Sequence, residues 1–385
     1  MEGAPGAMND RPMRVLHVIR PEESGSLGGA DLHVLDLCAA QAQGPHCRPA
    51  VLALDASHDF LRRAGQLGVT VHDPFRQRVG WWRRLAELPR ALEIDLVHAH
   101  GYEADYAATF SPMAASAWRG LPRVLTCHGI IAPDLRHKVM NMLDLWCMRR
   151  ASVLIAVAAP GAEMLRRAVR DVPIHVIPNG VLPPAAVEPA ERTKVRAELG
   201  ACGSRDILIG FVGRLSAEKR PDLLLQAVSR IAREQPTARF AFIGGGPLAR
   251  RTQQAVRDAR LDGRVTLGGL RHDMDAVYAA IDVLALPSDI EGTSRVLIEA
   301  QMRAVPVVAT AVGGSPELVR DGVTGFLVPP GRVDALTSAL TRLLTDHDLR
   351  TRMGRAAVDE AQGRTASVMA EAVQAIYDLM PPRKP

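Results

Sequence analysis

Cysteine and aromatic residues are scarce in this chain, and each scarcity argues against a class of protein. The 385 residues include five cysteines, without a CxxC pair or a Cys/His spacing typical of metal ligands. A disulfide framework and a structural zinc site are therefore not expected. Aromatic residues make up 4% of the chain, which leaves little surface for stacking on nucleic acid bases. No zinc-finger, RNA-recognition or basic-helix motif occurs, so nucleic acid is not an expected partner.

Long apolar runs are missing as well. No run reaches the roughly 18 residues that a membrane-spanning helix needs. Residues 1–11 lack the apolar core of a signal peptide. We therefore expect a cytoplasmic protein.

Lysine is rare, so the net charge of +5 comes largely from arginine. The arginine guanidinium binds phosphates and carboxylates in a bidentate manner. A phosphorylated ligand and an anionic membrane surface would account for this charge equally well.

Length and patterning predict two α/β domains. At 385 residues with 47% apolar content, the chain is globular and too long for one ordinary core. Short apolar runs alternate with helical patterns, beginning at Met13–Ile19 and again at Ile207–Val212. Such alternation is typical of parallel, doubly wound sheets. Further strands are predicted at Ala50–Leu54, Val69–His72, Ile94–Ala99, Val153–Val157, Ile174–Val181, Phe240–Ile243 and Val265–Leu267, and helices at Leu223–Ile231, Leu336–Leu344 and Ala366–Leu379.

A Pro-rich stretch at residues 183–189 has the composition of a linker. We therefore expect a flexible N-terminus at 1–12, a first domain at 13–182 and a linker at 183–204. A second domain is expected at 205–365, followed by a C-terminal helix at 366–385.

Two carboxylates lie eight positions apart around the predicted start of a helix in the second half. Asp282–Leu286 is typical of a buried strand, and a helical apolar stripe begins after Thr293 or Ser294, both favourable N-cap residues. The N–H groups of such a helix end suit a phosphate or a sugar hydroxyl. One carboxylate can accept from both hydroxyls of a vicinal diol, so Glu291 and Glu299 could hold both ends of a nucleotide-sugar. The alternative is a loop acid and a solvated helix residue.

A second candidate follows the strand at Ile207–Val212. Its loop, GRLSAEKRPD, carries Arg214 and Lys219 after a glycine. Arginine can fork onto a phosphate and lysine adds a point charge, so the loop is a candidate anion site. A solvated basic loop is the alternative.

The first half offers candidates at the ends of its strands, where ligands of parallel sheets collect. His100 and Tyr102 follow one strand, and His128 follows the next, in the segment VLTCHG. Gly28 and Gly29 lie in the loop after the first strand. Structural histidines and an ordinary turn are the alternatives.

The E-x7-E pattern at Glu291 and Glu299, followed by PVVAT and GGSPELVRDGVTGFLV, closely resembles the donor-binding segment of retaining GT-B glycosyltransferases of family 4. GR-x4-K at Arg214 and Lys219, the double glycine and the CHG loop extend the resemblance over nearly the whole chain. It implies an α/β fold of the GT-B type, with two Rossmann-like doubly wound parallel-sheet domains that face across a cleft. It also implies that helix 366–385 crosses back onto the first domain, which binds the acceptor.

The resemblance implies roles for individual residues. The histidine contacts the sugar, the first glutamate the transferred sugar, the second the ribose diol, and the two cations the diphosphate. His100 and Tyr102 are candidates on the acceptor side, and no metal ligand is expected. The implied catalytic residues are His128, Glu291, Arg214 and Lys219. The implied donor-binding residues are Gly28, Gly29, Arg214, Lys219, Gly245, Arg271, Glu291, Gly292, Thr293, Ser294 and Glu299.

Two positions depart from the family pattern. Ala304 stands where the family usually has a glycine that ends the helix, and a left-handed conformation there would cost about 1 to 2 kcal/mol. Ala158 and Ala159 stand where a serine usually follows the sixth strand.

The implied activity is that of a retaining, metal-independent hexosyltransferase without a cofactor. The sugar would move from a nucleotide-sugar to a glycan, lipid-linked or small-molecule acceptor, in bacterial polysaccharide or glycoconjugate biosynthesis. The DMD sequence at Asp273 and Asp275 lies on the loop expected near the base and is a weak metal signal. A same-fold sugar-nucleotide epimerase or phosphorylase, or an inactive nucleotide-sugar-binding subunit, are the alternatives. None of the lysines (Lys138, Lys194, Lys219, Lys384) lies in an evident cofactor motif.

Segment Arg76–Leu92 combines two tryptophans with five arginines. We favour a surface helix whose apolar side packs on the sheet. A peripheral contact with an anionic membrane, at its inner face, is the alternative.

Overall fold

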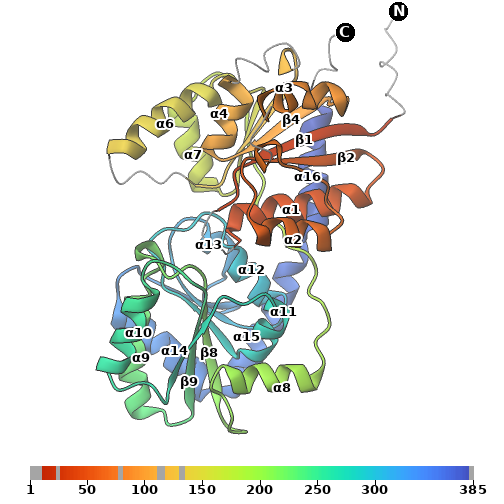
Figure 1. The fold of residues 1–385 in the computed structure, drawn as a ribbon. Helices are drawn as coiled ribbons and strands as arrows, with labels where there is room; N and C mark the ends of the chain where they lie inside the picture. Colours follow the sequence, from red (N-terminus) through yellow and green to blue (C-terminus); the bar gives the residue numbers. More distant parts are fainter. Residues whose placement is uncertain (1–10, 23–26, 77–80, 111–117, 130–134, 381–385) are drawn as a thin grey trace, which may run out of the picture. The chain divides into compact units, whose positions relative to one another are not determined.

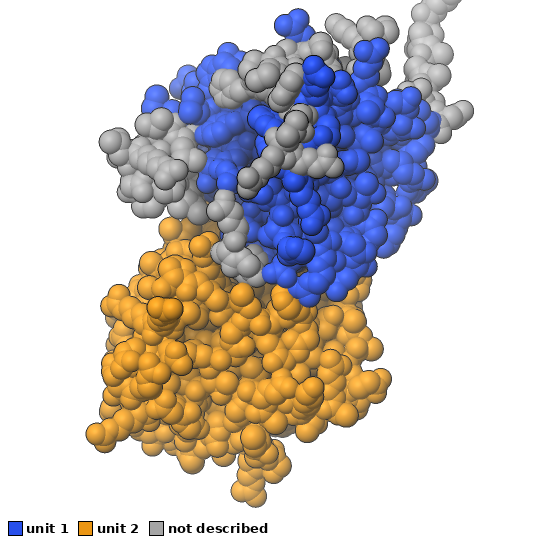
Figure 2. Space-filling model, in the orientation of Figure 1, with its two compact units in different colours: residues 1–157, 161–177, 366–385 blue, residues 158–160, 178–365 orange. Residues whose placement is uncertain are grey.

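The structure is a computed structural model that describes residues 11–22, 27–76, 81–110, 118–129 and 135–380. The chain divides into two compact units, which Figure 2 colours separately. Unit 1 spans residues 1–157, 161–177 and 366–385, and unit 2 spans residues 158–160 and 178–365.

Unit 1 is built on a parallel sheet, which has seven strands among the described residues, in the order β3-β2-β1-β4-β5-β6-β7 (Figure 1). Its strands are β1 (Met13–Ile19), β2 (Cys47–Ala53), β3 (Val71–His72), β4 (Leu96–His100), β5 (Arg123–Cys127), β6 (Val153–Ala156) and β7 (Ile174–Val176). Its helices are α1 (Gly29–Gln43), α2 (His58–Gln66), α3 (Trp81–Ala91), α4 (Tyr102–Phe110), α6 (Leu135–Met148), α7 (Ala159–Ala168) and α16 (Ala366–Asp378), with a 3₁₀ turn at Pro74–Arg76.

The strands of unit 1 are buried on both faces, as apolar strands of a parallel sheet are. On β1, Leu16 and Val18 belong to the apolar cluster that includes Ala104 of α4 and Leu165 of α7. Val15 points to the opposite face and packs in a cluster with Leu37 of α1 and residues of α16. The last helix of the chain therefore completes the core of the first unit.

Unit 2 repeats this plan with a parallel sheet that has six strands among the described residues, in the order β10-β9-β8-β11-β12-β13. Its strands are β8 (Ile207–Val212), β9 (Ala238–Ile243), β10 (Val265–Gly269), β11 (Val283–Leu286), β12 (Val307–Thr310) and β13 (Gly325–Val328). Its helices are α8 (Pro189–Glu198), α9 (Pro221–Glu234), α10 (Ala249–Asp258), α11 (Met274–Ala280), α12 (Arg295–Gln301), α13 (Ser315–Leu318), α14 (Val333–Thr345) and α15 (His347–Ala361), with 3₁₀ turns at Ala217–Lys219 and Gln362–Arg364. Two apolar clusters cover the two faces of this sheet.

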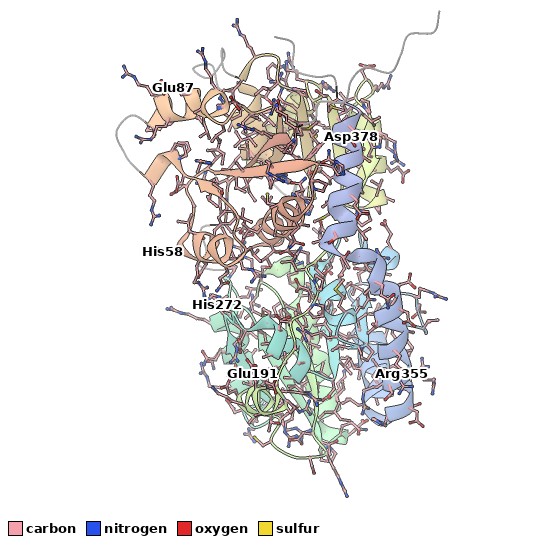
Figure 3. The ribbon with its side chains drawn as sticks, turned by 90° about the vertical axis from the view of Figure 1, so that its right-hand side faces the viewer. His58, Glu87, Glu191, His272, Arg355 and Asp378 are labelled. Carbon is pink, nitrogen blue, oxygen red and sulfur yellow. The ribbon has the colours of Figure 1, made fainter. Side chains whose placement is uncertain are left out.

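These two parallel, Rossmann-like sheets are the α/β architecture that the sequence predicts. Two helices were not anticipated. Residues 183–204, expected as a linker, contain α8, and Val195 and Leu199 pack into a core cluster of unit 2. Figure 3 labels Glu191 on this helix and His272 on the loop before α11, the helix against which α8 packs. Helix α15 follows α14 directly.

We found no helix in the described part of the chain that is both long and apolar enough to cross a bilayer.

Candidate functional site

Strand order places a candidate site in unit 2 between β8 and β11. The chain runs outward from β8 to β9 and β10 on one side, and from β11 to β12 and β13 on the other. At such a switch point the loops at the carboxyl ends of the two central strands diverge and leave room for a ligand. These loops are residues 213–220 after β8 and residues 287–294 after β11. They carry most of the residues that the E-x7-E and GR-x4-K motifs single out.

An ion pair joins the two loops. Lys219 Nζ lies 2.8 Å from Glu291 Oε1, although the residues are 72 positions apart in sequence. The Glu291 side chain is only 4% exposed, whereas Lys219 remains 24% exposed. Ser288 donates a further hydrogen bond of 2.7 Å to the same carboxylate oxygen. The carboxylate of Glu291 is therefore oriented by two donors, one of them a cation.

A second ion pair lies beside the first and holds the same two loops together. Arg220 binds Asp289 at 3.0 Å, and the Asp289 amide donates to the Glu218 carbonyl at 2.8 Å. Arg220 also pairs with Asp222, and these carboxylates raise the pKa of its guanidinium. Its left-handed backbone, at φ 50°, turns the chain into α9. This residue positions the neighbouring Lys219.

The backbone of Glu291 rests on a glycine pair after β12. A Cβ atom on Gly313 would lie 1.8 Å from the Glu291 carbonyl oxygen, and one on Gly314 would lie 2.6 Å from the Gly292 carbonyl oxygen. The Gly314 amide donates to that Gly292 carbonyl at 2.9 Å. Gly313 also has φ 51°, so side chains are excluded there for two reasons. The sequence alone assigns this pair no role beyond the family pattern.

Helix α12 begins where the sequence predicts, with Ser294 as its N-cap. Thr293 and Ser294 are buried, and Asn179 donates to the Thr293 carbonyl at 2.7 Å. Glu299, four residues after the first residue of the helix, accepts hydrogen bonds from Tyr278 at 2.7 Å and Arg295 at 3.2 Å. Both acids of the E-x7-E motif are thus oriented by donors of their own unit.

Arg214 is exposed in the loop after β8, and the backbone of its neighbours is fixed. The Gly213 amide donates to the Ile243 carbonyl, and the Leu215 amide donates to the Gly245 carbonyl. A Cβ atom on Gly244 would lie 2.0 Å from the Gly213 carbonyl oxygen. The glycine turn after β9 therefore serves close packing against the Arg214 loop.

Arg271, a predicted donor-binding residue, is engaged in ion pairs within unit 2. Its guanidinium binds Glu198 of α8 at 2.8 Å and Asp273. The Asp273 carboxylate holds the pKa of Arg271 above its usual value. Asp275 pairs with Arg303. Both acids of the DMD sequence thus face arginines, and Arg271 fastens α8 to the loop before α11.

In unit 1, Gly28 is the N-cap of α1, and its amide donates to Asp31 at 2.8 Å. Burial raises the pKa of Asp31 to about 6, while this hydrogen bond acts in the opposite direction. A Cβ atom on Gly28 would meet the Glu22 side chain at 2.9 Å, whereas one on Gly29 would meet no described atom within 4 Å. A side chain at position 28 would displace the flexible end of Glu22, whereas one at position 29 would meet open space among the described residues.

His128 follows β5 and is half-buried beside a second ring. Its Nε2 atom lies 3.4 Å from Nδ1 of His100, which is only 3% exposed. His100 is therefore buried beside His128 and offers little surface to a ligand. Tyr102, at the start of α4, is 42% exposed.

Trp81, in the basic tryptophan-bearing segment, packs inward. Its ring stacks on Phe75 with centroids 4.9 Å apart, and it packs against an apolar cluster of unit 1. The side chain of Trp82 lies outside the described residues. Arg83 and Arg90 are exposed on the same helix. This favours the interpretation of α3 as a surface helix.

Comparisons with known proteins agree with the motifs. Residues 195–359 match the family model described as glycosyl transferases group 1, and residues 27–183 match the one described as glycosyltransferase family 4. A D-inositol 3-phosphate glycosyltransferase of Actinosynnema mirum is 30% identical over 312 residues, which are 74% of this chain and 72% of that protein. A protein of the same name from Kribbella flavida is 37% identical over 190 residues, which are 46% of this chain and 45% of that protein.

A solved structure has the same fold. The crystal structure of Anabaena HepE in complex with UDP and glucose matches with a TM-score of 0.82 and 24% identity. The match covers 96% of this chain and all of that chain.

Proposed function

The chain belongs to the group 1 glycosyl transferases of glycosyltransferase family 4, with the GT-B α/β fold, and from this premise we propose that it transfers a sugar from a nucleotide-sugar to an acceptor hydroxyl. The observation that carries the proposal is the ion pair of Lys219 with the buried Glu291 at the switch point of unit 2. An acid held at the end of a central strand beside a cation suits a ligand that combines hydroxyls with a diphosphate.

Each motif residue then has a defined task. Glu291 accepts hydrogen bonds from the transferred sugar, and Glu299 accepts both ribose hydroxyls. Arg214 and Lys219 bind the diphosphate, and the backbone of residues 292–294 contacts the sugar and the phosphates. Unit 1 supplies His128 at the sugar and the binding surface for the acceptor, which includes Tyr102.

The reaction breaks the bond between the anomeric carbon and the diphosphate oxygen and forms a bond from that carbon to the acceptor oxygen. The acceptor proton passes to the departing diphosphate, and the acceptor attacks from the same face, so the anomeric configuration is retained. Negative charge grows on the diphosphate as it leaves. Arg214 and Lys219 are fixed positive charges that stabilise this charge.

We propose that these side chains make a divalent cation unnecessary. The acids of the DMD sequence, Asp273 and Asp275, are each paired with an arginine. The transfer should therefore proceed in the presence of a chelator. Loss of activity with chelator and recovery with magnesium or manganese would contradict this proposal.

The names of similar proteins narrow the donor and acceptor that we propose. Anabaena HepE is described in complex with UDP-glucose, and the similar Actinosynnema mirum protein is named for D-inositol 3-phosphate. We propose a nucleoside diphosphate hexose as donor and a hydroxyl-rich small molecule, glycan or lipid-linked glycan as acceptor, in polysaccharide or glycoconjugate biosynthesis.

We also propose that the protein acts in the cytoplasm. The five cysteines are free thiols, which suits a reducing compartment. A peripheral contact of the exposed arginines of α3 with the inner face of an anionic membrane is the finer proposal. Co-flotation with anionic liposomes tests it, and flotation that is unchanged by Arg83→Ala with Arg90→Ala would contradict it.

The proposal is tested by incubating the protein with UDP-, GDP-, ADP- and dTDP-sugars, each with a panel of hydroxylated acceptors. A new glycoside of retained anomeric configuration supports the transferase. An altered free nucleotide-sugar would instead indicate an epimerase, and a sugar phosphate formed with inorganic phosphate would indicate a phosphorylase. Donor binding without any product would indicate a binding subunit.

A further inference from the structure

A buried polar stripe runs across one face of the sheet in unit 1. Side chains alternate between the two faces of a strand, so His17 of β1 and His98 and His100 of β4 share the face of Val15. Thr126 of β5 continues the stripe, because it pairs in register with His100. Helices α1 and α16 cover this face. All four side chains are at most 3% exposed.

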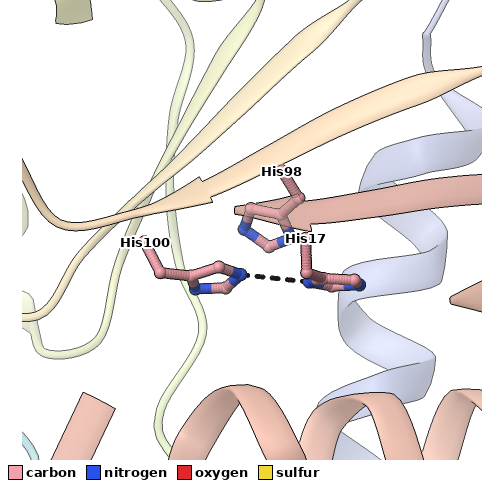
Figure 4. Close-up of side chains that lie close together, drawn as sticks. All are labelled: His17, His98 and His100. Carbon is pink, nitrogen blue, oxygen red and sulfur yellow. Dashed lines mark hydrogen bonds between the residues drawn. The ribbon is translucent and has the colours of Figure 1, made fainter. Parts of the chain in front are cut away.

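One chain of hydrogen bonds leads from α1 to His128. Gln41 Oε1 lies 2.9 Å from His17 Nε2, and His17 Nδ1 lies 3.0 Å from His100 Nε2. Figure 4 shows His17 and His100 joined in this way, with His98 beside them. His100 Nδ1 then lies 3.4 Å from His128 Nε2. The chain therefore ends on the histidine that we place at the sugar.

A second chain starts from the same amide. Gln41 Nε2 donates to the Tyr377 hydroxyl of α16 at 3.4 Å. That hydroxyl lies 2.6 Å from His98 Nδ1, and His98 Nε2 lies 2.7 Å from Thr126 Oγ1. The oxygen of the Gln41 amide thus binds one histidine chain, and its nitrogen binds the other.

The chemistry of the amide fixes the position of every ring proton in the first chain. An amide oxygen only accepts, so His17 carries its proton on Nε2. A neutral imidazole has one donor and one acceptor, so His17 Nδ1 accepts from His100 Nε2–H. By the same step His100 Nδ1 accepts from His128 Nε2–H.

Burial keeps the rings of His17 and His100 neutral near pH 7. Burial lowers the pKa of His17 to about 4. Burial and then the neighbouring histidines lower the pKa of His100 well below its usual value.

Hydrogen bonds also argue against a metal among His17, His98 and His100, which lie close enough together to hold one. Both ring nitrogens of His17 and both of His98 already have partners on other residues. A metal ion at these rings would have to break those bonds.

We propose that Gln41 is a positioning residue, which through His17 and His100 holds His128 with its proton on Nε2 and its lone pair on Nδ1. The ring then accepts a hydrogen bond from a sugar hydroxyl. The identity of this ligand rests on the proposed function, whereas the position of the proton does not.

The position of the proton can be read from the full-length protein without donor. Nitrogen-15-labelled histidine gives long-range correlation spectra that distinguish the two neutral tautomers, and His128→Gln assigns the resonance. We expect the Nε2–H tautomer for His128 near neutral pH. A wild-type His128 with its proton on Nδ1 would overturn the proposal, whether or not any variant folds. Ring shifts typical of a bound metal that change on adding chelator would also overturn it.

Two substitutions separate the two chains. Gln41→Met removes the amide, and we expect His128 to become a mixture of tautomers. Tyr377→Phe interrupts only the second chain, so it should change the resonance of His98 and leave that of His128 in place. An unchanged His128 resonance in Gln41→Met would overturn the proposal.

The transfer assay then links the tautomer to the reaction. Gln41→Met should lower the rate of transfer several-fold while the protein remains folded. If transfer persists at the wild-type rate although the tautomer has changed, the role of Gln41 in positioning is wrong. If no donor is turned over by the wild type, the proposed function fails, but the spectra still decide the position of the proton.

Discussion

The candidate residues of the two units lie in different electrostatic environments, one ionic and one neutral. In unit 2 the side chains that we assign to the donor are ionic and belong to pairs such as Lys219 with Glu291. In unit 1 the side chains behind His128 are neutral and are linked by hydrogen bonds between rings and amides. Charge at the first site suits a diphosphate, and neutral rings at the second suit hydroxyls. Two domains of the same fold therefore contain different polar groups, which are ion pairs in unit 2 and neutral hydrogen-bonded rings in unit 1.

The largest expected effect is on the ionic side of this comparison. Lys219→Ala should lower kcat about 10²–10³-fold, the usual result of removing one preorganised charge at a leaving group. Steady-state kinetics with the preferred donor measures it. Lys194→Ala, on the exposed face of α8, is the matched control and should keep the wild-type rate. Equal rates for Lys219→Ala and wild type would remove the ionic site from the reaction.

Tyr377→Phe tests the neutral hydrogen-bond network of unit 1 through the free energy of unfolding. The substitution removes one hydroxyl and leaves His98 Nδ1 and Gln41 Nε2 without this partner in the core. We expect the free energy of unfolding to fall by about 1–3 kcal/mol. Urea denaturation measures the change, and Glu371→Ala, on the exposed face of the same helix, should have little effect. A stability equal to that of the wild type would show that the hydroxyl is not held as described.

The neutral rings also predict how stability depends on pH. The folded pKa of His17 is about 4, against 6.5 in the unfolded chain, so between these values the unfolded state binds more protons. The contribution of His17 is present above pH 6.5 and is lost as the pH falls towards 4, by up to about 1.4 kcal/mol per pH unit. The raised pKa of Asp31, about 6, acts in the opposite direction below pH 6.

The contribution of His17 can be separated from that of other groups by comparing the pH dependence of stability in variants with that of the wild type. His17 is surrounded by His98 and His100 of β4 and by Gln41 of α1. His17→Asn should therefore reduce the slope of stability against pH between 6.5 and 4. His58→Gln, on an exposed ring at the start of α2, should keep the wild-type slope. Identical slopes for His17→Asn and wild type would show that this ring titrates normally in the fold.

The smallest effect concerns the backbone that supports the ionic site. Ala304 has φ 57°, the left-handed conformation that the missing glycine of the family pattern implies. Ala304→Gly should raise the stability by about 1 kcal/mol. Ala232→Gly, inside α9, should instead lower it by about 0.5–1 kcal/mol. Thermal unfolding compares the two, and a loss of stability in Ala304→Gly would contradict the assigned strain.

The sequence predicts what depends on local spacing. Strands β1 and β8 have the predicted bounds, because buried parallel strands are continuous apolar runs. Strand β7 ends at Val176, before the predicted end, because Pro178 cannot donate to a sheet ladder. Helix α15 was not predicted because its buried face is formed largely by small residues, which leave no clear apolar stripe in the sequence. Of these, Gly354 lies against the Ala304 carbonyl.

Among the candidate site residues, too, those in short local motifs could be predicted and those that depend on tertiary packing could not. Glu291, Glu299, Arg214 and Lys219 could be found because each pair lies within one short motif. The residues behind His128 could not, since Gln41 is linked to it only through the tertiary packing of His17 and His100. Strand alternation does place His17 and His98 on one face, and that signal was available in the sequence.

Calorimetric titration of nucleotide-sugars in the presence of a chelator tests the central claim most directly. We predict that one donor binds wild-type protein with chelator present and that Lys219→Ala weakens its binding, whereas Lys194→Ala leaves it unchanged. Binding that requires a divalent cation, or that is the same in Lys219→Ala and wild type, would contradict the claim that the side chains of unit 2 themselves neutralise the diphosphate.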